Sequence, residues 1–317
     1  MISNWVATVA VVTVLLLGSH HRAESQEPTL TLTLATATAG GGFEVFGREA
    51  ASAMSAADPG LALKTLATDG STDNIGRLER GEVDLALVAG IPAYEAIYGV
   101  GRPKASLSII AALYASPGLF AVRSDTPARS FRDMVGKRVA WGTRASGLTA
   151  TGIAIATGLG LDPERDFQAR YVEKAGEGPA LVLSGEVDGF WGGGSGWPGF
   201  VKITESGGRL VGLADEEIAT VVAKRPFLKP MTLPAGSYPG QSQPIRSVGA
   251  WAYIVSRSDL PEASAYRAAA ALAAAQPRLA EKLPQAVETT PENTARAAPS
   301  RGDLHPGVER FLRERGL

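Results

Sequence analysis

Short apolar segments alternate with segments of helical periodicity from residue 29 onward, and this alternation constrains the fold more than any other feature. Residues 29 to 35 (TLTLTLA), 61 to 67 (LALKTLA) and 83 to 88 (VDLALV) are typical of strands. Helices are predicted between them, because apolar residues recur there at helical spacing: Phe43, Phe46, Ala50 and Met54 in the first, and Ile75 and Leu78 in the second, which stops at Gly81. Strand, helix, strand order predicts a parallel sheet with right-handed crossovers, and hence an α/β fold.

The same pattern recurs later in the chain. Residues 137 to 141 (KRVAW) are predicted to form a strand, a helix is predicted from Ser146 to Gly158, and residues 181 to 191 (LVLSGEVDGFW) contain a helix end and a further strand. The tetrapeptide Gly-Glu-Val-Asp occurs at residues 81 to 84 and again at 185 to 188. Four residues can repeat by chance, but both copies lie between a helix end and a buried strand, which favours two similarly built lobes.

Two segments are predicted to connect these lobes. Residues 119 to 125 (LFAVRSD), after Pro117 and Gly118, would carry the chain out, and residues 247 to 260 (SVGAWAYIVSRSDL) would bring it back. Lobe 1 is then predicted to comprise residues 29–118 and 250–317, and lobe 2 residues 119–249, with a ligand cleft between them. The Ala-rich stretch 265 to 283 is predicted to be a packing helix interrupted at Pro277.

Residues 1–23 are predicted to be a signal peptide. An apolar run at residues 6 to 18 is too short to span a bilayer comfortably, and Ala23 offers a cleavage position in the polar stretch that follows. No Lys or Arg precedes the run, and His21 stands where a small residue is preferred, so an uncleaved anchor or a buried strand are the alternatives. The favoured interpretation is export to the periplasm.

Composition excludes several classes of function. The formal charge of −1 leaves no basic surface for nucleic acid. The chain has no Cys, and only His305 remains outside the predicted leader, which argues against thiol chemistry, disulfides, a His-based triad and a multi-His zinc site. No phosphate-loop, nucleophile-elbow or EF-hand motif is present either. We therefore predict a protein that is not an enzyme and has no metal ion or cofactor.

Three turns, each joining a strand to a helix start, are candidate ligand-binding loops: residues 36 to 43 (TATAGGGF), 69 to 74 (DGSTDN) and 142 to 149 (GTRASGLT). In an open parallel sheet such turns meet at the carboxyl edge of the strands. Free backbone N–H groups at helix starts can hold an anion there. The structural alternative is that Ser71 and Ser146 are ordinary N-cap residues and that Gly40 to Gly42 permit a tight turn.

Residues 188 to 200 (DGFWGGGSGWPGF) place Trp191 and Trp197 beside a run of glycines. Aromatic walls next to closely approached backbone are typical of a binding cleft, which is the favoured interpretation; the alternative is that either Trp is a core residue. Residues 194 to 199 fit GxGxxG, but Pro198 interrupts the motif and a strand, turn, helix placement is not expected here, so a dinucleotide site is not favoured.

Several segments together resemble the TAXI-type solute receptors of tripartite ATP-independent periplasmic (TRAP) transporters. PAGSYPGQ, within residues 225 to 241, and LHPG, near the C-terminus, are the most specific of them. The others, in chain order, are TATAGGGF, GSTDNIGRLERGEVDLALV, GKRVAWGTRASGLT and SVGAWAYIVSRSDLP.

This resemblance implies a two-lobed fold of the type II periplasmic binding protein class. Each lobe would be a mostly parallel sheet flanked by helices, and a two-strand hinge would close the lobes on a small organic acid or acidic amino acid. The partner would be an ion-gradient-driven TRAP-type permease in the membrane. Matching the family motifs places the following residues in the cleft: Thr36, Thr38, Gly41, Gly42, Phe43, Glu44, Ser71, Asn74, Ser146, Gly147 and Thr149.

This sequence departs from the family pattern at three places, so the bound solute can differ as well. Phe43-Glu44 replaces a frequent Tyr-Tyr pair, Ala89-Gly90 follows VDLALV where Gln is frequent, and Leu148 follows Ser146-Gly147 where Thr is usual. Arg144 is predicted to be the charged partner of an acidic group on the ligand, because its planar fork can bind a carboxylate through two hydrogen bonds. The alternative is that Arg144 is a solvated loop residue.

Two other classes of function remain open at this point. The same fold carries enzymes of cofactor biosynthesis, and Arg, Lys and Asp residues are available for such chemistry. A periplasmic sensory receptor would bind the same solutes but dock a signalling protein instead of a permease.

Overall fold

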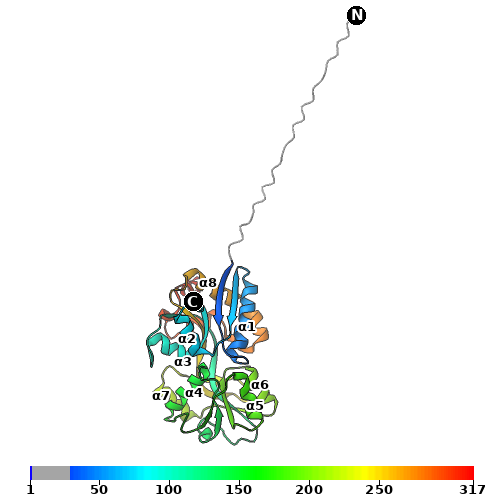
Figure 1. Cartoon of the computed structure of the whole chain (residues 1–317), viewed down its shortest axis with the longest axis vertical. Helices are drawn as coiled ribbons and strands as arrows, with labels where there is room; N and C mark the ends of the chain where they lie inside the picture. Colours follow the sequence, from blue (N-terminus) through cyan, green and yellow to red (C-terminus); the bar gives the residue numbers. More distant parts are fainter. Residues whose placement is uncertain (2–28) are drawn as a thin grey trace.

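A computed structural model describes residue 1 and residues 29–317 (Figure 1). The predicted signal peptide therefore lies, apart from residue 1, outside the described residues. None of the helices in the described part is long and apolar enough to cross a membrane.

Strands and helices alternate through most of the described chain. The strands are β1 (Leu30–Ala35), β2 (Leu61–Leu66), β3 (Leu85–Ala89), β4 (Leu107–Val122), β5 (Arg138–Ala140), β6 (Gln168–Arg170), β7 (Gly189–Gly193), β8 (Arg209–Val211), β9 (Lys229–Leu233) and β10 (Ile245–Arg257). The α-helices are α1 (Gly42–Ala57), α2 (Ser71–Glu79), α3 (Gly90–Tyr98), α4 (Gly147–Gly158), α5 (Gly178–Leu183), α6 (Pro198–Glu205), α7 (Asp215–Lys224), α8 (Glu262–Lys282), α9 (Pro291–Ala297) and α10 (Pro306–Glu314). Short 3₁₀ turns include η2 (Ala175–Glu177) and η3 (Pro284–Glu288).

The strands form one continuous path in the order β2-β1-β3-β10-β4-β7-β5-β6, with β8 beside β4 and β9 beside β10. Within this path β1 pairs in parallel with β2 and β3, and β5 pairs in parallel with β6 and β7. Helices flank both parallel groups: α1, α2, α3 and α8 lie in one lobe and α4 to α7 in the other (Figure 1). This is the predicted two-lobed α/β fold.

Two long antiparallel strands, β4 and β10, join the lobes. They pair with each other between Leu107 and Pro117 of β4, and β4 then pairs with β7 from Gly118 to Val122. The crossing strand predicted at residues 119 to 125 thus begins earlier, at Leu107, and ends sooner, at Val122. It begins earlier because the chain stays extended through Pro117. Proline adopts extended φ values and loses only one ladder N–H, and Pro117 lies where β4 exchanges one partner strand for another. The residues chosen as lobe boundaries stay a prediction.

The repeated Gly-Glu-Val-Asp has the same structural role in both lobes: it ends a helix and binds the neighbouring strand. Its glycine ends a helix with positive φ, 70° at Gly81 and 78° at Gly185. Its aspartate binds the start of the neighbouring strand: Asp84 Oδ2 accepts from Thr33 N at 2.8 Å, and Asp188 Oδ2 accepts from Arg138 N at 2.9 Å. The backbone N–H groups of both aspartates donate back to the same residues. Two similarly built lobes are therefore confirmed.

One helix prediction was wrong in detail. Pro277 does not interrupt the Ala-rich helix, since α8 runs without a break from Glu262 to Lys282. Pro277 is exposed, whereas Ala268, Leu272, Ala275 and Leu279 of the same helix are buried. Burial of that apolar face against α1 and α10 outweighs the hydrogen bond that a proline removes.

Candidate functional site

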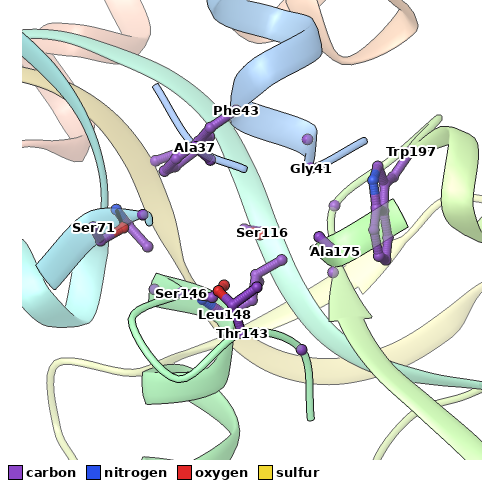
Figure 2. A pocket seen from close by; sticks show the side chains of 18 of the residues that line it. Ala37, Gly41, Phe43, Ser71, Ser116, Thr143, Ser146, Leu148, Ala175 and Trp197 are labelled. Carbon is purple, nitrogen blue, oxygen red and sulfur yellow. Dashed lines mark hydrogen bonds between the residues drawn. The ribbon is translucent and has the colours of Figure 1, made fainter. Parts of the chain in front are cut away.

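A pocket lies between the lobes, with an empty volume of about 840 Å³ that includes space open to solvent. Residues of both lobes line it, and the three predicted loops all contribute (Figure 2). Small-molecule sites occupy clefts of this size at domain interfaces. The pocket is therefore the candidate ligand site.

The first loop lines the pocket with Thr38, Gly41, Gly42 and Phe43. It is bonded to lobe 2 through Ala175 N, which donates to Thr38 Oγ1 at 3.2 Å, and through Trp197 Nε1, which donates to Gly40 O at 3.2 Å. Gly40 has a φ of 75°, and a Cβ placed on it would lie 2.7 Å from the Cα of Gly176. Glycine is required here because the two lobes approach each other backbone to backbone.

The second loop supplies Asp69, Gly70 and Ser71 at the start of α2. Ser71 is fully buried, and its hydroxyl accepts from Ala89 N at 3.1 Å, so it fastens α2 to the end of β3. Two bonds connect this loop to lobe 2: Thr72 N donates to Ala145 O, and Thr143 Oγ1 donates to Asp69 O. The second loop therefore also takes part in closing the lobes.

The third loop presents the start of α4 to the same space. Ser146 is the N-cap, and its hydroxyl accepts from Leu148 N at 3.2 Å. A Cβ placed on Gly147 would lie 2.4 Å from both the Ser71 hydroxyl and the Ala89 Cβ of lobe 1. The α4 start is thus pressed against lobe 1, and Ser146 and Gly147 line the pocket where the two lobes meet.

Trp191 and Trp197 line the pocket and are also buried, at 1% and 6% exposure, so each is both a core residue and a pocket residue, and their contact with a ligand stays a prediction. Trp191 Nε1 donates to Leu148 O, and the ring packs against Phe120, Phe131 and Trp141. The Gly-rich run forms β7, a turn and α6, so strand, turn and helix do follow one another here, contrary to expectation. The turn needs glycine because φ is 81° at Gly194 and 65° at Gly196.

Three predicted residues, Thr36, Asn74 and Thr149, lie behind the pocket wall and hold the loops in place. Asn74 Nδ2 donates to the carbonyls of Thr36 and Leu87, and Thr149 Oγ1 donates to those of Trp141 and Thr143. Thr36 Oγ1 donates to Leu66 O. The structure gives these side chains protein partners and does not place them in the pocket lining.

Two predicted charged residues also lie outside the lining. Glu44 pairs with Arg48 one helical turn later, at 2.5 Å. The Arg144 side chain is 72% exposed, its guanidinium lies 3.7 Å from the centre of the Tyr171 ring, and it is 3.4 Å from Glu164. Arg144 is therefore not placed as the partner of an anion in the pocket, and its role in binding stays a prediction.

Sequence reasoning missed several lining residues: Tyr114, Ser116, Trp141, Phe190, Ser195 and Gln285. Tyr114 and Ser116 belong to β4, and the apolar run that precedes Pro117 is typical of a buried strand that contains both residues. Gln285 lies in η3, after α8, and no motif marks it. Its position depends on packing between segments far apart in the sequence.

The lining is aromatic and almost free of charge. Phe43, Tyr114, Trp141, Phe190, Trp191 and Trp197 supply rings, and among the described residues of the lining only Asp69 has a formally charged side chain. Burial raises the pKa of Tyr114, so its hydroxyl remains protonated and can donate. The described residues contain no group of three His, Cys, Asp or Glu placed to hold a metal ion.

A family model described as the NMT1-like family matches residues 34–316. Among solved structures, the chain is similar to a protein of Bordetella bronchiseptica RB50, with 12% identity, a TM-score of 0.55 and coverage of 89% of this chain and 82% of that chain. It is similar to a periplasmic transporter, with 15% identity, a TM-score of 0.52 and coverage of 90% and 92%. It is also similar to full-length BenM, with 13% identity, a TM-score of 0.51 and coverage of 81% and 70%. These likenesses show a periplasmic-binding-protein-like fold.

Proposed function

The chain belongs to the NMT1-like family, and from this premise we propose that it is a periplasmic solute receptor that captures a small organic acid and delivers it to a membrane transporter. The proposed receptor binds its solute without converting it. The solved structure of a periplasmic transporter on the same fold supports this assignment.

The observation that carries the proposal is the way the pocket is closed. Residues of the first two loops make hydrogen bonds to lobe 2: Thr38, Ala39, Gly40, Asp69 and Thr72. Since these loops also line the pocket, the same loops meet the solute and hold the lobes together. A solute that contacts these loops should therefore favour the closed form of the protein. This is the behaviour required of a receptor whose closed form is recognised by a transporter.

An acidic group on the solute is supported by the helix starts. The start of α4 carries partial positive charge. Leu148 N already donates to the Ser146 hydroxyl, so we propose that a carboxylate binds the N–H of Gly147, which has no acceptor within its own helix. Ser146 and Gly147 line the pocket at this point.

The proposed partner is a TRAP-type permease, on the strength of the TAXI-like segments in the sequence. Residues 234–241 (PAGSYPGQ) and 304–307 (LHPG) resemble that family most specifically. Tyr238 belongs to the first of these segments. Its hydroxyl donates to Gly194 O and accepts from Trp197 N. One family-like segment therefore supports the turn that borders the pocket.

A thermal-shift screen of the purified protein against organic acids and amino acids tests capture, because a ligand that binds only the folded state raises the melting temperature by mass action. Calorimetry then gives the dissociation constant, and mass spectrometry of the bound solute shows whether it is converted. Steady conversion to a product would contradict a receptor, and so would the absence of any ligand in the screen.

Location and delivery need their own test. The proposed export predicts a shortened chain in the periplasmic fraction, with an N-terminus after residue 23. Uptake of the identified solute into vesicles that contain a TRAP-type permease of the same organism should then depend on added receptor. Uptake that proceeds equally well without it would exclude this partner.

A further inference from the structure

One side chain in the pocket has an unsatisfied polar atom that the protein itself does not explain. Gln285 is 8% exposed and lines the pocket, and its Oε1 has no hydrogen-bond partner among the described residues. Buried polar groups are nearly always hydrogen-bonded, and leaving one unpaired is unfavourable. A bound group that completes its hydrogen bonds would account for this position.

Gln285 is held firmly at the border between the lobes. The η3 turn that carries it is bonded to hinge strand β4, since Glu288 Oε2 accepts from Ala115 N and Thr289 Oγ1 donates to Leu113 O. Across the cleft, a Cβ placed on Gly196 of lobe 2 would lie 3.3 Å from Gln285 Oε1. The amide is therefore positioned at the pocket wall and does not lie on a free surface.

Tyr114 borders the same glycine turn. One of its ring carbons lies 3.6 Å from the position of a Cβ on Gly194. Gln285 and Tyr114 together offer an amide that can both donate and accept and a hydroxyl that can donate. Neither side chain carries a positive charge, so this end of the pocket can bind a neutral hydrogen-bonding group.

The charge of the lining limits what can bind there. One carboxylate can be held by the helix start at Ser146. A second would be buried near Asp69 with no Lys, Arg or His among the described residues of the lining. In Figure 2, Ser71 and Trp197 mark opposite sides of the pocket, and Gly196, next to Trp197, belongs to the turn that Gln285 faces. A solute with a single acidic end fits this distribution of charge.

We propose that Gln285 is a specificity-determining residue, whose amide binds an uncharged hydrogen-bonding group at the end of the solute remote from its acidic group. The preferred class is then a monocarboxylate with a carboxamide-like second end, and dicarboxylates are disfavoured. This inference rests on the proposed receptor function and names the substrate class of that same site.

Two matched pairs of compounds serve as probes: 4-carbamoylbenzoate against terephthalate, and succinamate against succinate. Within each pair the shape is nearly constant and one carboxamide replaces one carboxylate. Calorimetry on the wild-type protein should show the monoamide binding about tenfold more tightly than the diacid in at least one pair, as expected for hydrogen bonds gained without burying a second charge.

Gln285→Leu removes the amide while keeping the size of the side chain. We expect the monoamide to bind about tenfold more weakly and the preference over the diacid to disappear, while the melting temperature of the free protein stays level or rises, because no internal hydrogen bond is lost. Tyr114→Phe should weaken binding of the monoamide less than Gln285→Leu does.

Gln276→Leu is the control, because Gln276 Nε2 donates to Ala286 O and the residue lies outside the pocket lining. It should lower the melting temperature and leave the preference intact.

The outcomes separate this inference from the proposed function. Diacids that bind as tightly as monoamides, or a preference that survives Gln285→Leu, would overturn the role of Gln285 while the receptor function stands. Binding of some other solute in the wider screen, with none of the four probes bound, would overturn the substrate class. A protein that binds nothing in either experiment would refute the receptor function itself.

Discussion

In lobe 1 the strand after Gly81 is aliphatic (LALVA), whereas the corresponding strand of lobe 2, after Gly185, combines glycine with aromatic residues (GFWGG). Both strands are buried along their whole length. The glycines of β7 leave room for rings: a Cβ on Gly192 would lie 2.6 Å from the Trp197 ring and 2.8 Å from that of Phe200. Lobe 2 thus contributes four of the six aromatic residues that line the pocket, and lobe 1 contributes the other two, Phe43 and Tyr114, together with hydroxyl groups and the amide of Gln285.

The lobes also share details beyond the repeated tetrapeptide. Arg257, at the end of β10, lies against Gly81 and pairs with Asp259, and Arg123, just after β4, lies against Gly185 and pairs with Asp125. At the end of each hinge strand an Arg, Arg257 in β10 and Arg123 directly after β4, thus covers the helix end of its lobe. The scaffold is common to both lobes, and the difference between them is concentrated at the pocket.

Two glycines of α4 differ in what they contact: Gly147 lies against the other lobe, and Gly152 is packed inside its own lobe. A Cβ on Gly147 would press on Ser71 and Ala89 of lobe 1, whereas a Cβ on Gly152 would lie 2.7 Å from both Trp141 and Trp191 inside lobe 2. We expect Gly147→Ala to weaken solute binding on the order of a hundredfold, since overpacking costs about 1–3 kcal/mol and here opposes the closed form. The melting temperature of the free protein should not fall, because Ala favours helix.

Gly152→Ala is the matched variant in the same helix and should lower the melting temperature of the free protein. Calorimetry and thermal unfolding of both variants provide the comparison. Equal loss of stability in the two would show that Gly147 serves the fold and not closure.

The paired aspartates test whether the repeat stabilises both lobes alike. Asp84→Ala and Asp188→Ala should each lower the free energy of unfolding by about 2 kcal/mol, because each removes a charged acceptor from a strand N–H. Asp188→Ala should cost more, since Asp188 also binds the Arg138 guanidinium through both oxygens, at 2.7 and 3.1 Å. Urea unfolding measures the free energy of unfolding of both variants. An unchanged value for either variant would show that the repeat does not stabilise the two lobes alike.

Acid should remove the contribution of Asp188. The Arg138 guanidinium holds the pKa of this carboxyl below its usual value of 3.8. A carboxyl with a lowered pKa stabilises the fold above its unfolded pKa, and the stabilisation is lost as the pH falls through the folded pKa. The difference in stability between wild type and Asp188→Ala should therefore be full at pH 7 and shrink below about pH 4. A difference that stays constant down to pH 3 would contradict this.

Trp197→Phe probes one hydrogen bond between the lobes. The variant keeps an aromatic ring but loses the N–H that donates to Gly40 O at 3.2 Å. We expect about fivefold weaker solute binding, in keeping with one neutral hydrogen bond. Calorimetry measures it, and unchanged affinity would mean that this bond does not favour closure.

Arg144→Ala should have the smallest effect. The Arg144 guanidinium lies on the Tyr171 ring, and the residue is outside the pocket lining. We therefore expect the affinity for the solute to change less than about threefold, as for an exposed ion pair. A loss of tenfold or more would show that Arg144 reaches the solute after all, as the sequence alone had suggested. Circular dichroism of the variant confirms that the fold is intact.

The sequence by itself determined the alternation of strands and helices, the two similar lobes and the three loops at their carboxyl edges. These features depend on local periodicity and on residues with fixed backbone demands, such as Gly81 and Gly185, so neighbouring residues suffice to reveal them. The same local reasoning failed at Pro277, where the buried face of α8 outweighed one lost hydrogen bond.

Only the tertiary structure decided which polar side chains meet the pocket. Asn74 and Thr149 looked like ligand contacts in the sequence, but their hydrogen bonds go to carbonyls of their own lobes. Gln285 carried no motif, yet packing of η3 on the hinge strand brings it to the pocket wall, more than 200 positions after the first loop. A side chain's partner is set by which distant segments pack together, and a linear pattern does not encode that geometry.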